Sequence, residues 1–198
     1  MKSADIKKIR KSMEKSLDAK RFEHTLGVAY TACALAMCND VDMTKAQTAG
    51  LLHDCAKCLS DEKKIEICKK NHVEINSVEN RNPFLLHAKA GSCIARKKFH
   101  VEDEDILNAI LYHTTGRPGM SKLEKIIYIA DYIEPGRKQA SNLKEIRKLA
   151  FQNLDMALLR VLEDTLAYLK STGNEVDFMT QETYDYYINL RNSGELKQ

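Results

Sequence analysis

The chain is poor in the residues that interrupt helices. It contains 3 prolines and 8 glycines in 198 residues, and no Asn-Gly or Asp-Gly pair separates two alternating apolar runs. Such a pair is the strongest short-range signal for a β-hairpin. Apolar residues recur instead every three or four positions, which is the spacing of one face of an α-helix. These features predict an all-α fold.

Segments with this spacing define the expected helices. They span residues 3–17, 21–38, 44–56, 61–71, 84–99, 102–113, 121–133, 142–171 and 181–190. The longest loop is expected over residues 76–83. No internal repeat, low-complexity tract or change of composition divides the chain, and its length suits one domain of roughly 100–200 residues. We therefore expect a single domain over residues 1–198.

Charge and hydropathy argue against several classes of protein. Hydrophobic residues make up 43% of the chain and charged residues 30%, and the net charge of +3 is too small to indicate binding to nucleic acid or to a membrane surface. The longest nearly apolar stretch, residues 27–38, is too short to span a bilayer. The first residues lead into lysines, so no secretory signal is expected, and the six cysteines are expected to be reduced thiols in the cytoplasm.

A His-Asp pair stands out behind an apolar run. His53 and Asp54 follow residues 49–52, which are small or apolar. Two adjacent ionisable side chains are costly to bury unless something binds them. Divalent ions of the zinc, iron and manganese type are the usual binding partners, because imidazole nitrogen and carboxylate oxygen are both good ligands for them. The pair therefore indicates a metal site.

The rest of the chain supplies further metal-binding side chains. His24 lies upstream of the pair, and His87, His113 and Asp131 lie downstream. At helical spacing most of these residues share a face with small or apolar neighbours, so we expect them to point towards the core. A lone histidine on such a face is more often a satisfied core residue than a ligand. Four histidines and two aspartates, with few basic residues to pair with them, predict a metal centre.

Two basic residues lie one helical turn from expected ligands. Lys57 follows Asp54 by three positions, and Arg21 precedes His24 by three. Beside a metal site that binds phosphate, a lysine can neutralise charge on a phosphoryl oxygen, and an arginine can hold the phosphate. The alternative for Lys57 is a surface lysine that extends from a helix end. The neighbouring His-Asp pair favours the functional interpretation.

A rival metal site can be drawn from cysteines. The spacing C-x₂-C-x₉-C-x₃-H, formed by Cys55, Cys58, Cys68 and His72, superficially resembles a structural zinc site. No turn residues form a knuckle around the first two cysteines, which lie on the end of an expected helix. Short Cys-His patterns of this kind occur often by chance. The histidine and aspartate set is therefore preferred.

The ligands and their neighbours resemble a known family. The order His24, His53-Asp54, Asp131 resembles the H…HD…D pattern of the HD-domain metal-dependent phosphohydrolases, and two further histidines match members that bind a second metal. The segments that narrow the resemblance to the YqeK family, the bacterial symmetrical diadenosine tetraphosphatases, are Arg21-x-x-His24, His53-Asp54-x-x-Lys57, residues 113–118 (HTTGRP) and residues 131–137 (DYIEPGR). The similarity extends from about Arg21 to the C-terminus, with the core motifs over residues 21–137. The run 87–91 (HAKAG) departs from the pattern, because a glycine is expected sooner after its histidine.

The resemblance implies a fold and a cofactor. The fold would be a single HD-domain helical bundle whose C-terminal helices complete the substrate pocket. The cofactor would be a di-iron centre or another divalent pair, with Asp54 as the ligand that both metals share. The first metal would be held by His24, His53, Asp54 and Asp131. The second would be held by Asp54, His87 and His113.

The resemblance also implies an activity, the hydrolysis of diadenosine tetraphosphate into two ADP by attack of a metal-activated water on the polyphosphate. Asp54 and Lys57 would be catalytic, and a homodimer is implied. Substrate binding is expected of Arg21, His53, Asp54, Lys57, His87, His113, Thr114, Asp131 and Arg137. Arg137 follows a Pro-Gly turn that suits a phosphate clamp, although a plain surface arginine is the alternative. The turn 114–116 is expected to offer backbone N–H groups to phosphate oxygens.

Two other functions stay open at this point. One is an HD-domain nucleotidase that acts on nucleoside monophosphates or alarmone nucleotides. The other is a binding or signalling module that keeps the metal without catalysis. The intact ligand set and Lys57 argue against the second.

Overall fold

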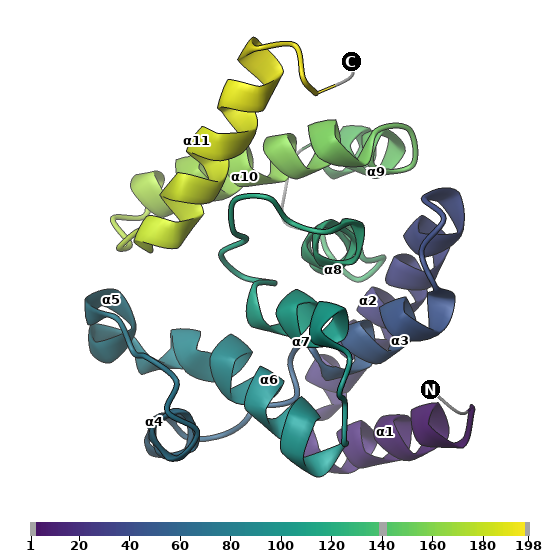
Figure 1. Ribbon diagram of the computed structural model, residues 1–198, viewed down its shortest axis with the longest axis vertical. Helices are drawn as coiled ribbons and strands as arrows, with labels where there is room; N and C mark the ends of the chain where they lie inside the picture. Colours follow the sequence, from purple (N-terminus) through teal and green to yellow (C-terminus); the bar gives the residue numbers. More distant parts are fainter. Residues whose placement is uncertain (1–2, 139–141, 197–198) are drawn as a thin grey trace.

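The computed structural model describes residues 3–138 and 142–196, and every regular element within them is a helix (Figure 1). In chain order these are α1 (Ser3–Ser16), α2 (Ala19–Cys38), α3 (Met43–Leu52), α4 (Asp61–Lys70), α5 (Ser77–Arg81), the 3₁₀ helix η1 (Pro83–Leu86), α6 (His87–Lys98), α7 (Glu104–Leu111), α8 (Lys122–Ile133), α9 (Leu143–Ala150), α10 (Leu154–Ser171) and α11 (Phe178–Asn192). The all-α class predicted from the sequence is confirmed. None of the described helices combines the length and the apolar character that crossing a membrane requires.

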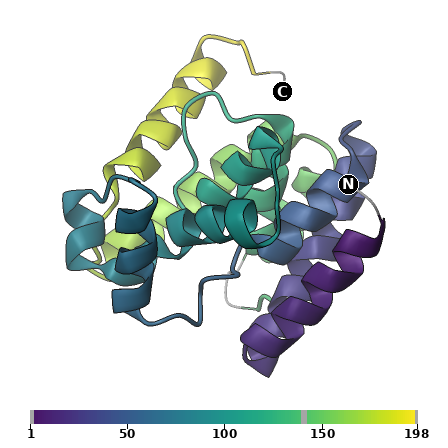
Figure 2. The same ribbon diagram turned by 60° about the horizontal axis from the view of Figure 1, so that its bottom comes forward.

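Helix α8 lies at the centre of the fold. It packs against α2, α3, α7, α9 and α10 (Figures 1 and 2). Most of its side chains from Leu123 to Ile133 are buried. A helix that is apolar around most of its circumference is stable only inside a domain. Helix α8 therefore presents Asp131, near its C-terminal end, from a rigid and buried frame.

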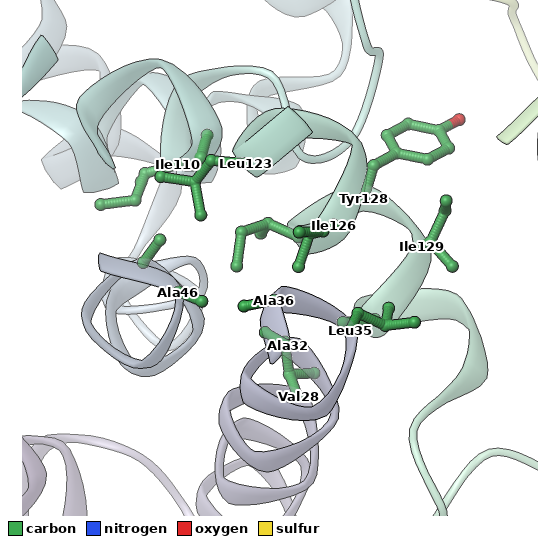
Figure 3. Close-up of a cluster of buried hydrophobic side chains, with 14 of the residues drawn as sticks. Val28, Ala32, Leu35, Ala36, Ala46, Ile110, Leu123, Ile126, Tyr128 and Ile129 are labelled. Atoms are coloured by element: carbon green, nitrogen blue, oxygen red, sulfur yellow. The ribbon is translucent and has the colours of Figure 1, made fainter. Parts of the chain in front are cut away.

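Helices α2 and α3 approach each other closely because small residues lie between them. A Cβ at Gly50 would lie 2.7 Å from the Cα of Ala29, so only glycine permits this separation. Figure 3 shows Leu35 of α2 and the side chains of Ile126 and Ile129 on α8 in the same buried cluster. The close packing fixes the C-terminal end of α3 against α2 and α8, where the site described below forms.

Two groups of helices flank α7 and α8. Helices α4, α5 and α6 form one group, and α9, α10 and α11 form the other (Figure 1). Polar side chains bridge the two groups: Asn76 donates to Asp177 at 2.9 Å, and Arg81 pairs with Glu175 at 2.6 Å. The residues between the groups line one of the two cavities described below.

The expected helix over residues 142–171 is in fact two helices. Residues 151–153 separate α9 from α10, so the prediction of one long helix was wrong. The side chain of Asn153 accepts a hydrogen bond from the N–H of Met156 at 3.0 Å, which makes Asn153 the N-cap of α10. Apolar periodicity continues across the break, and a single asparagine within it is a weak signal unless its capping role is recognised.

Helix caps also explain two other differences. The segment 76–83, expected to be a loop, contains α5, because Asn76 and Glu79 form a capping box that starts a short helix. The last helix starts at Phe178 rather than at residue 181, because the side chain of Asp177 accepts from the N–H of Met179 at 2.9 Å. In both places a polar residue supplies a partner for backbone N–H groups that a helix leaves unpaired.

Candidate metal centre

Three of the expected ligands lie at the ends of helices rather than inside them. Helix α3 ends at Leu52 and α7 at Leu111, so His53 and His113 lie in the turns that follow. The predicted helices over residues 44–56 and 102–113 therefore extend too far. His87 is the first residue of α6 and follows η1 directly, within a segment expected to be one continuous helix.

Each of these three histidine rings is oriented in the same way. Nδ1 bonds the backbone carbonyl three residues earlier, at 2.7 Å in His53, 2.8 Å in His87 and 2.7 Å in His113. Carbonyls in the last turn of a helix have no partner within the helix, and the ring N–H supplies one. Because a carbonyl only accepts, Nδ1 carries the proton, and Nε2 of the neutral ring keeps a lone pair. This is the tautomer that binds a metal through Nε2.

The carboxylate of Asp54 lies in the middle of the cluster. Its Oδ2 is 3.5 Å from Nε2 of His53 and 3.9 Å from Nε2 of His24. Its Oδ1 is 3.4 Å from Nε2 of His87 and 3.6 Å from Nε2 of His113. The two oxygens of one carboxylate therefore face two different pairs of imidazoles.

The two pairs define two sides of the cluster. The α8 side consists of His24, His53 and Asp131: Oδ1 of Asp131 lies 3.0 Å from Nε2 of His24 and 4.0 Å from Nε2 of His53. The α6 side consists of His87 and His113, whose Nε2 atoms lie 3.2 Å apart. The structure thus brings all six predicted ligands together, including His87, whose surrounding sequence departs from the family pattern.

The arrangement fits a divalent metal. The Nε2 atoms of His24 and His53 are buried and have no hydrogen-bond partner. Oδ1 of Asp131 approaches the first of them to 3.0 Å, a contact that positive charge stabilises, whether a metal ion near both atoms or a proton on the ring. Among the described residues, two groups place ligand atoms within 4.8 Å of one another, His24–His53–Asp131 and His53–Asp54–His113. Imidazole and carboxylate donors in this arrangement suit a divalent ion of the zinc, iron or manganese type.

Burial favours the neutral form of two of the imidazoles, whereas the carboxylates of Asp131 and Glu134 outweigh burial at His24 and raise its pKa. Burial lowers the pKa of His53 to about 4 and the pKa of His87 to about 3. Burial acts to raise the pKa of Asp54, but the adjacent His53 and His113 rings and the ammonium of Lys57 outweigh it, so that pKa lies well below its usual range. At neutral pH His53 and His87 therefore present lone pairs and Asp54 a carboxylate, the ionisation states that a metal requires.

His24 is oriented by a residue that the sequence did not assign to the site. Its Nδ1 donates to Oε1 of Glu134 at 3.0 Å, and the other carboxylate oxygen accepts from the N–H of Gly136. A Cβ at Gly27 would lie 2.6 Å from Oε2 of Glu134, so glycine on α2 makes room for this buried side chain. Partners of this kind fix the tautomer of a ligand and raise its basicity. The available signal was a Glu-Pro-Gly turn three residues after Asp131.

Two arginines lie against the carboxylates of the cluster. Nη1 of Arg21 donates to Oδ2 of Asp54 at 2.8 Å, and Nη2 of Arg137 donates to Oδ1 of Asp131 at 2.7 Å. The Arg21 side chain is 30% exposed and that of Arg137 is 42% exposed. Both guanidinium groups therefore reach the cluster while staying in contact with solvent, as a phosphate-binding arginine must.

Lys57 lies on the α6 side of the cluster. Its Nζ is 3.0 Å from Nε2 of His87 and 3.9 Å from Oδ1 of Asp54. Burial lowers the pKa of Lys57, although the nearby carboxylates oppose this effect. The ammonium is directed at the middle of the site, so a surface lysine without contacts to the site is excluded.

Two cavities adjoin the cluster. The proximal cavity, of about 590 Å³, is lined by His113, Thr114, Asp131 and Arg137, together with side chains of α10. The distal cavity, of about 680 Å³, lies between α5–α6 and α10–α11, and it also includes Thr114 in its wall. The N–H of Gly116 donates to the carbonyl of Tyr112 at 2.8 Å, so this amide does not point at a phosphate as expected for the turn 114–116.

The cysteine pattern does not form a second metal site. Sγ of Cys55 donates to the carbonyl of Gly91, and exposed Cys58 contacts the carboxylate of Asp18. Cys68 belongs to a separate buried apolar cluster. In the part of the chain that the structure describes, neither group with metal-binding geometry contains a cysteine.

The fold and the site define a class of protein. The HD domain family model matches residues 21–136, so the chain belongs to the HD domain family. A solved structure from Clostridium acetobutylicum, described as a predicted HD superfamily hydrolase involved in NAD metabolism, is 46% identical. It superposes with a TM-score of 0.90 over 96% of this chain and 98% of its own.

Individual relatives narrow the class and confirm the resemblance to the YqeK family. The chain is 39% identical to the "Bis(5'-nucleosyl)-tetraphosphatase, symmetrical" of Bacillus subtilis, over 89% of this chain and 94% of the relative. It is 35% identical to the protein of the same name from Staphylococcus aureus, over 92% and 94% of the two chains. The match extends beyond the HD model at residue 136 and includes most of the C-terminal helices.

Proposed function

We propose that this chain hydrolyses diadenosine tetraphosphate symmetrically, into two ADP, at a divalent metal centre. The observation that carries the proposal is the cluster around Asp54, in which the Nε2 atoms of four histidines and the carboxylate of Asp131 converge. The activity named for the relatives from Bacillus subtilis and Staphylococcus aureus supports the choice of substrate.

Six side chains would hold the metal. On the α8 side these are His24, His53 and Asp131, and on the α6 side they are His87 and His113, with one oxygen of Asp54 directed to each side. A divalent ion bound there would polarise phosphoryl oxygens and lower the pKa of a bound water. The proposal gives Asp54 a catalytic role because both sides of the centre depend on its carboxylate.

The cations around the cluster would bind the polyphosphate. Arg21 and Arg137 hold phosphate oxygens, and Lys57 neutralises the charge that spreads over a phosphoryl group as its bond breaks. Their contacts with Asp54 and Asp131 place these side chains at the edge of the cluster. We also assign substrate contacts to the ligands His53, His87 and His113 and to Thr114. Thr114 lies in the wall of both cavities.

We propose a single HD-domain unit over residues 1–198, in which α10 and α11 complete the substrate pocket. Side chains of α10 line both cavities and those of α11 line the distal one, which supports this role for the two helices. Iron is the metal that we assign to the centre, on the family resemblance. A cytoplasmic location agrees with the six free thiols, which persist in a reducing compartment.

A homodimer is also proposed. The exposed apolar side chains of Tyr30, Met37 and Met43, on α2 and at the start of α3, support it, because such side chains commonly lie in protein–protein contacts. Light scattering on the purified protein should give twice the chain mass of 22.5 kDa. A monomer mass at micromolar concentration would contradict this part of the proposal.

The activity is tested by identifying products. Purified protein is mixed anaerobically with diadenosine tetraphosphate and iron(II), and nucleotides are separated by chromatography. ADP as the sole product is expected, whereas AMP with ATP, or no turnover, would contradict the proposal. Parallel incubations with nucleoside monophosphates and alarmone nucleotides test the nucleotidase alternative, which the names of the relatives do not favour.

A further inference from the structure

The hydrolysis of a phosphoanhydride does not by itself require the distal cavity, so the cavity needs another explanation. Its volume of about 680 Å³ lies within the roughly 300–1,000 Å³ typical of small-molecule sites. Three residues, Thr114, Thr165 and Tyr168, line both this cavity and the proximal one. The two cavities are therefore neighbours separated by a shared wall.

The two cavities lie beside different parts of the metal cluster. The proximal cavity includes two ligands themselves, Asp131 of the α8 side and His113 of the α6 side, and the guanidinium of Arg137. The distal cavity includes Phe84 and Ala88, which lie before and after the first residue of α6, and the carbonyl of Phe84 accepts the bond that orients that histidine. A ligand whose phosphates lie on the cluster would therefore have both cavities within reach, one on each side of the wall that they share.

The distal cavity has the chemistry of a nucleoside site rather than a phosphate site. Its wall contains the carboxylates of Glu79, Glu175 and Asp177. Because Glu79 pairs with Lys89 and Glu175 with Arg81, the described residues of the wall offer no free cation to a phosphate. Two aromatic side chains that line it, Tyr168 and Phe178, are exposed to 63% and 53%. Exposed rings beside a cavity offer faces on which a base can stack, and carboxylates accept hydrogen bonds from ribose hydroxyls and amino groups.

The cations that would bind phosphate lie elsewhere, around the cluster. Arg21, Lys57 and Arg137 contact the carboxylates in its middle and on its α8 side, and none of the three lines the distal cavity. The one lysine that lines it, Lys89, is paired with Glu79 at 2.7 Å. The side chains that can bind phosphate are thus gathered at the cluster and absent from the described wall of the distal cavity, which matches a molecule with phosphates in its middle and a nucleoside at its end.

We propose that the distal cavity binds one nucleoside of a dinucleoside polyphosphate, while the proximal cavity binds the other. The inference rests on the proposed function and deepens it, because it makes recognition of two nucleosides the source of substrate choice. A nucleotide with one nucleoside leaves one cavity empty and binds more weakly for that reason.

Phe178 provides the test, because its ring lines only the distal cavity and lies at the exposed start of α11. Phe178→Ala removes the ring, and Phe178→Leu keeps apolar bulk but removes the flat face. Phe151→Ala is the matched control: Phe151 is 47% exposed and lines neither cavity. Metal content and thermal unfolding of each variant are measured alongside the kinetics, so that loss of folding is separated from loss of binding.

Both Phe178 variants are expected to raise KM for diadenosine tetraphosphate by about fivefold or more, the lower end of the cost of losing one base–aromatic stack, with kcat nearly unchanged. Adenosine 5′-tetraphosphate, used as a competitive inhibitor, should weaken by a smaller factor, because its single nucleoside can occupy the proximal cavity. If the unmodified protein is active and all three variants match it within about twofold, the distal cavity does not bind a nucleoside and the proposed function stands. If the unmodified protein does not cleave diadenosine tetraphosphate, the proposed function and this inference both fail.

Discussion

The two sides of the metal cluster balance their charge differently. On the α8 side, His24 lies between two carboxylates, with Asp131 3.0 Å from one ring nitrogen and Glu134 3.0 Å from the other. On the α6 side, two imidazoles face each other at 3.2 Å, and the carboxylate oxygen near both is Oδ1 of Asp54. The ammonium of Lys57 lies 3.9 Å from that same oxygen, so it would compete with a metal ion for the negative charge of the carboxylate.

This difference in charge predicts how firmly each side would hold a metal ion. The α8 side has an anionic ligand of its own and a buried partner that orients its outer histidine, so we expect it to hold a metal firmly. The α6 side depends on the shared carboxylate of Asp54 and is weakened by its lysine. We therefore expect a chelator to empty the α6 side first.

The largest effect is expected where the two sides meet. Asp54→Ala removes the ligand that we propose both sides share, and it also leaves Arg21 and Lys57 without the carboxylate that they contact. We expect loss of bound metal and a fall in turnover of about a thousandfold or more, measured by elemental analysis and ADP release. Asp185→Ala, at an exposed position on α11, is the control. Full activity in the Asp54 variant would mean that the site lies elsewhere.

A cation on each side gives the next test. Lys57→Ala should leave the metal content unchanged and lower kcat about a hundredfold, because a donor to the phosphoryl oxygens is lost near the α6 side. Arg137→Ala removes the corresponding cation near the α8 side and should raise KM more than it lowers kcat. Lys63→Ala, 54% exposed, serves as the control for charge. Loss of metal in the Lys57 variant would show that this residue has a structural role.

Glu134→Gln tests the orienting partner of the α8 side alone. Glutamine keeps the shape, but only one end of its amide accepts a hydrogen bond, so either His24 or the N–H of Gly136 loses its partner. We expect metal affinity to fall about 10-fold to 100-fold, as measured by competition with a chelator. Glu104→Gln, 65% exposed, should change nothing. If both variants bind the metal with equal affinity, Glu134 does not support the metal site by orienting His24.

The smallest effect is expected at the cysteines. Cys55→Ser and Cys58→Ser touch neither side of the cluster, and a serine hydroxyl can replace the thiol bond to the carbonyl of Gly91. Metal content and turnover should stay within about twofold of the unmodified protein. Loss of zinc or of other metal from these variants would favour the cysteine pattern instead.

The sequence predicted the members of the cluster better than the helices that carry them. The six residues of the cluster were predicted to lie together because histidine and aspartate are rare on apolar faces, and their order matches a family pattern. Helix ends were missed, since apolar periodicity does not show that His53 and His113 turn back to cap carbonyls. Glu134 was missed because a single glutamate in a turn resembles a surface residue. Only the structure shows that Gly27 and Gly136 leave the space that its carboxylate occupies. The distal cavity joins segments from residue 73 to residue 180, and no local pattern predicts such a space.

Anomalous X-ray scattering from crystals of anaerobically prepared protein tests the metal cluster most directly. Data collected on both sides of the iron absorption edge should show two peaks, one between His24, His53 and Asp131, and one between His87 and His113, with Asp54 touching both. A peak at the cysteines, or none within the cluster in protein that turns over diadenosine tetraphosphate, would contradict the account.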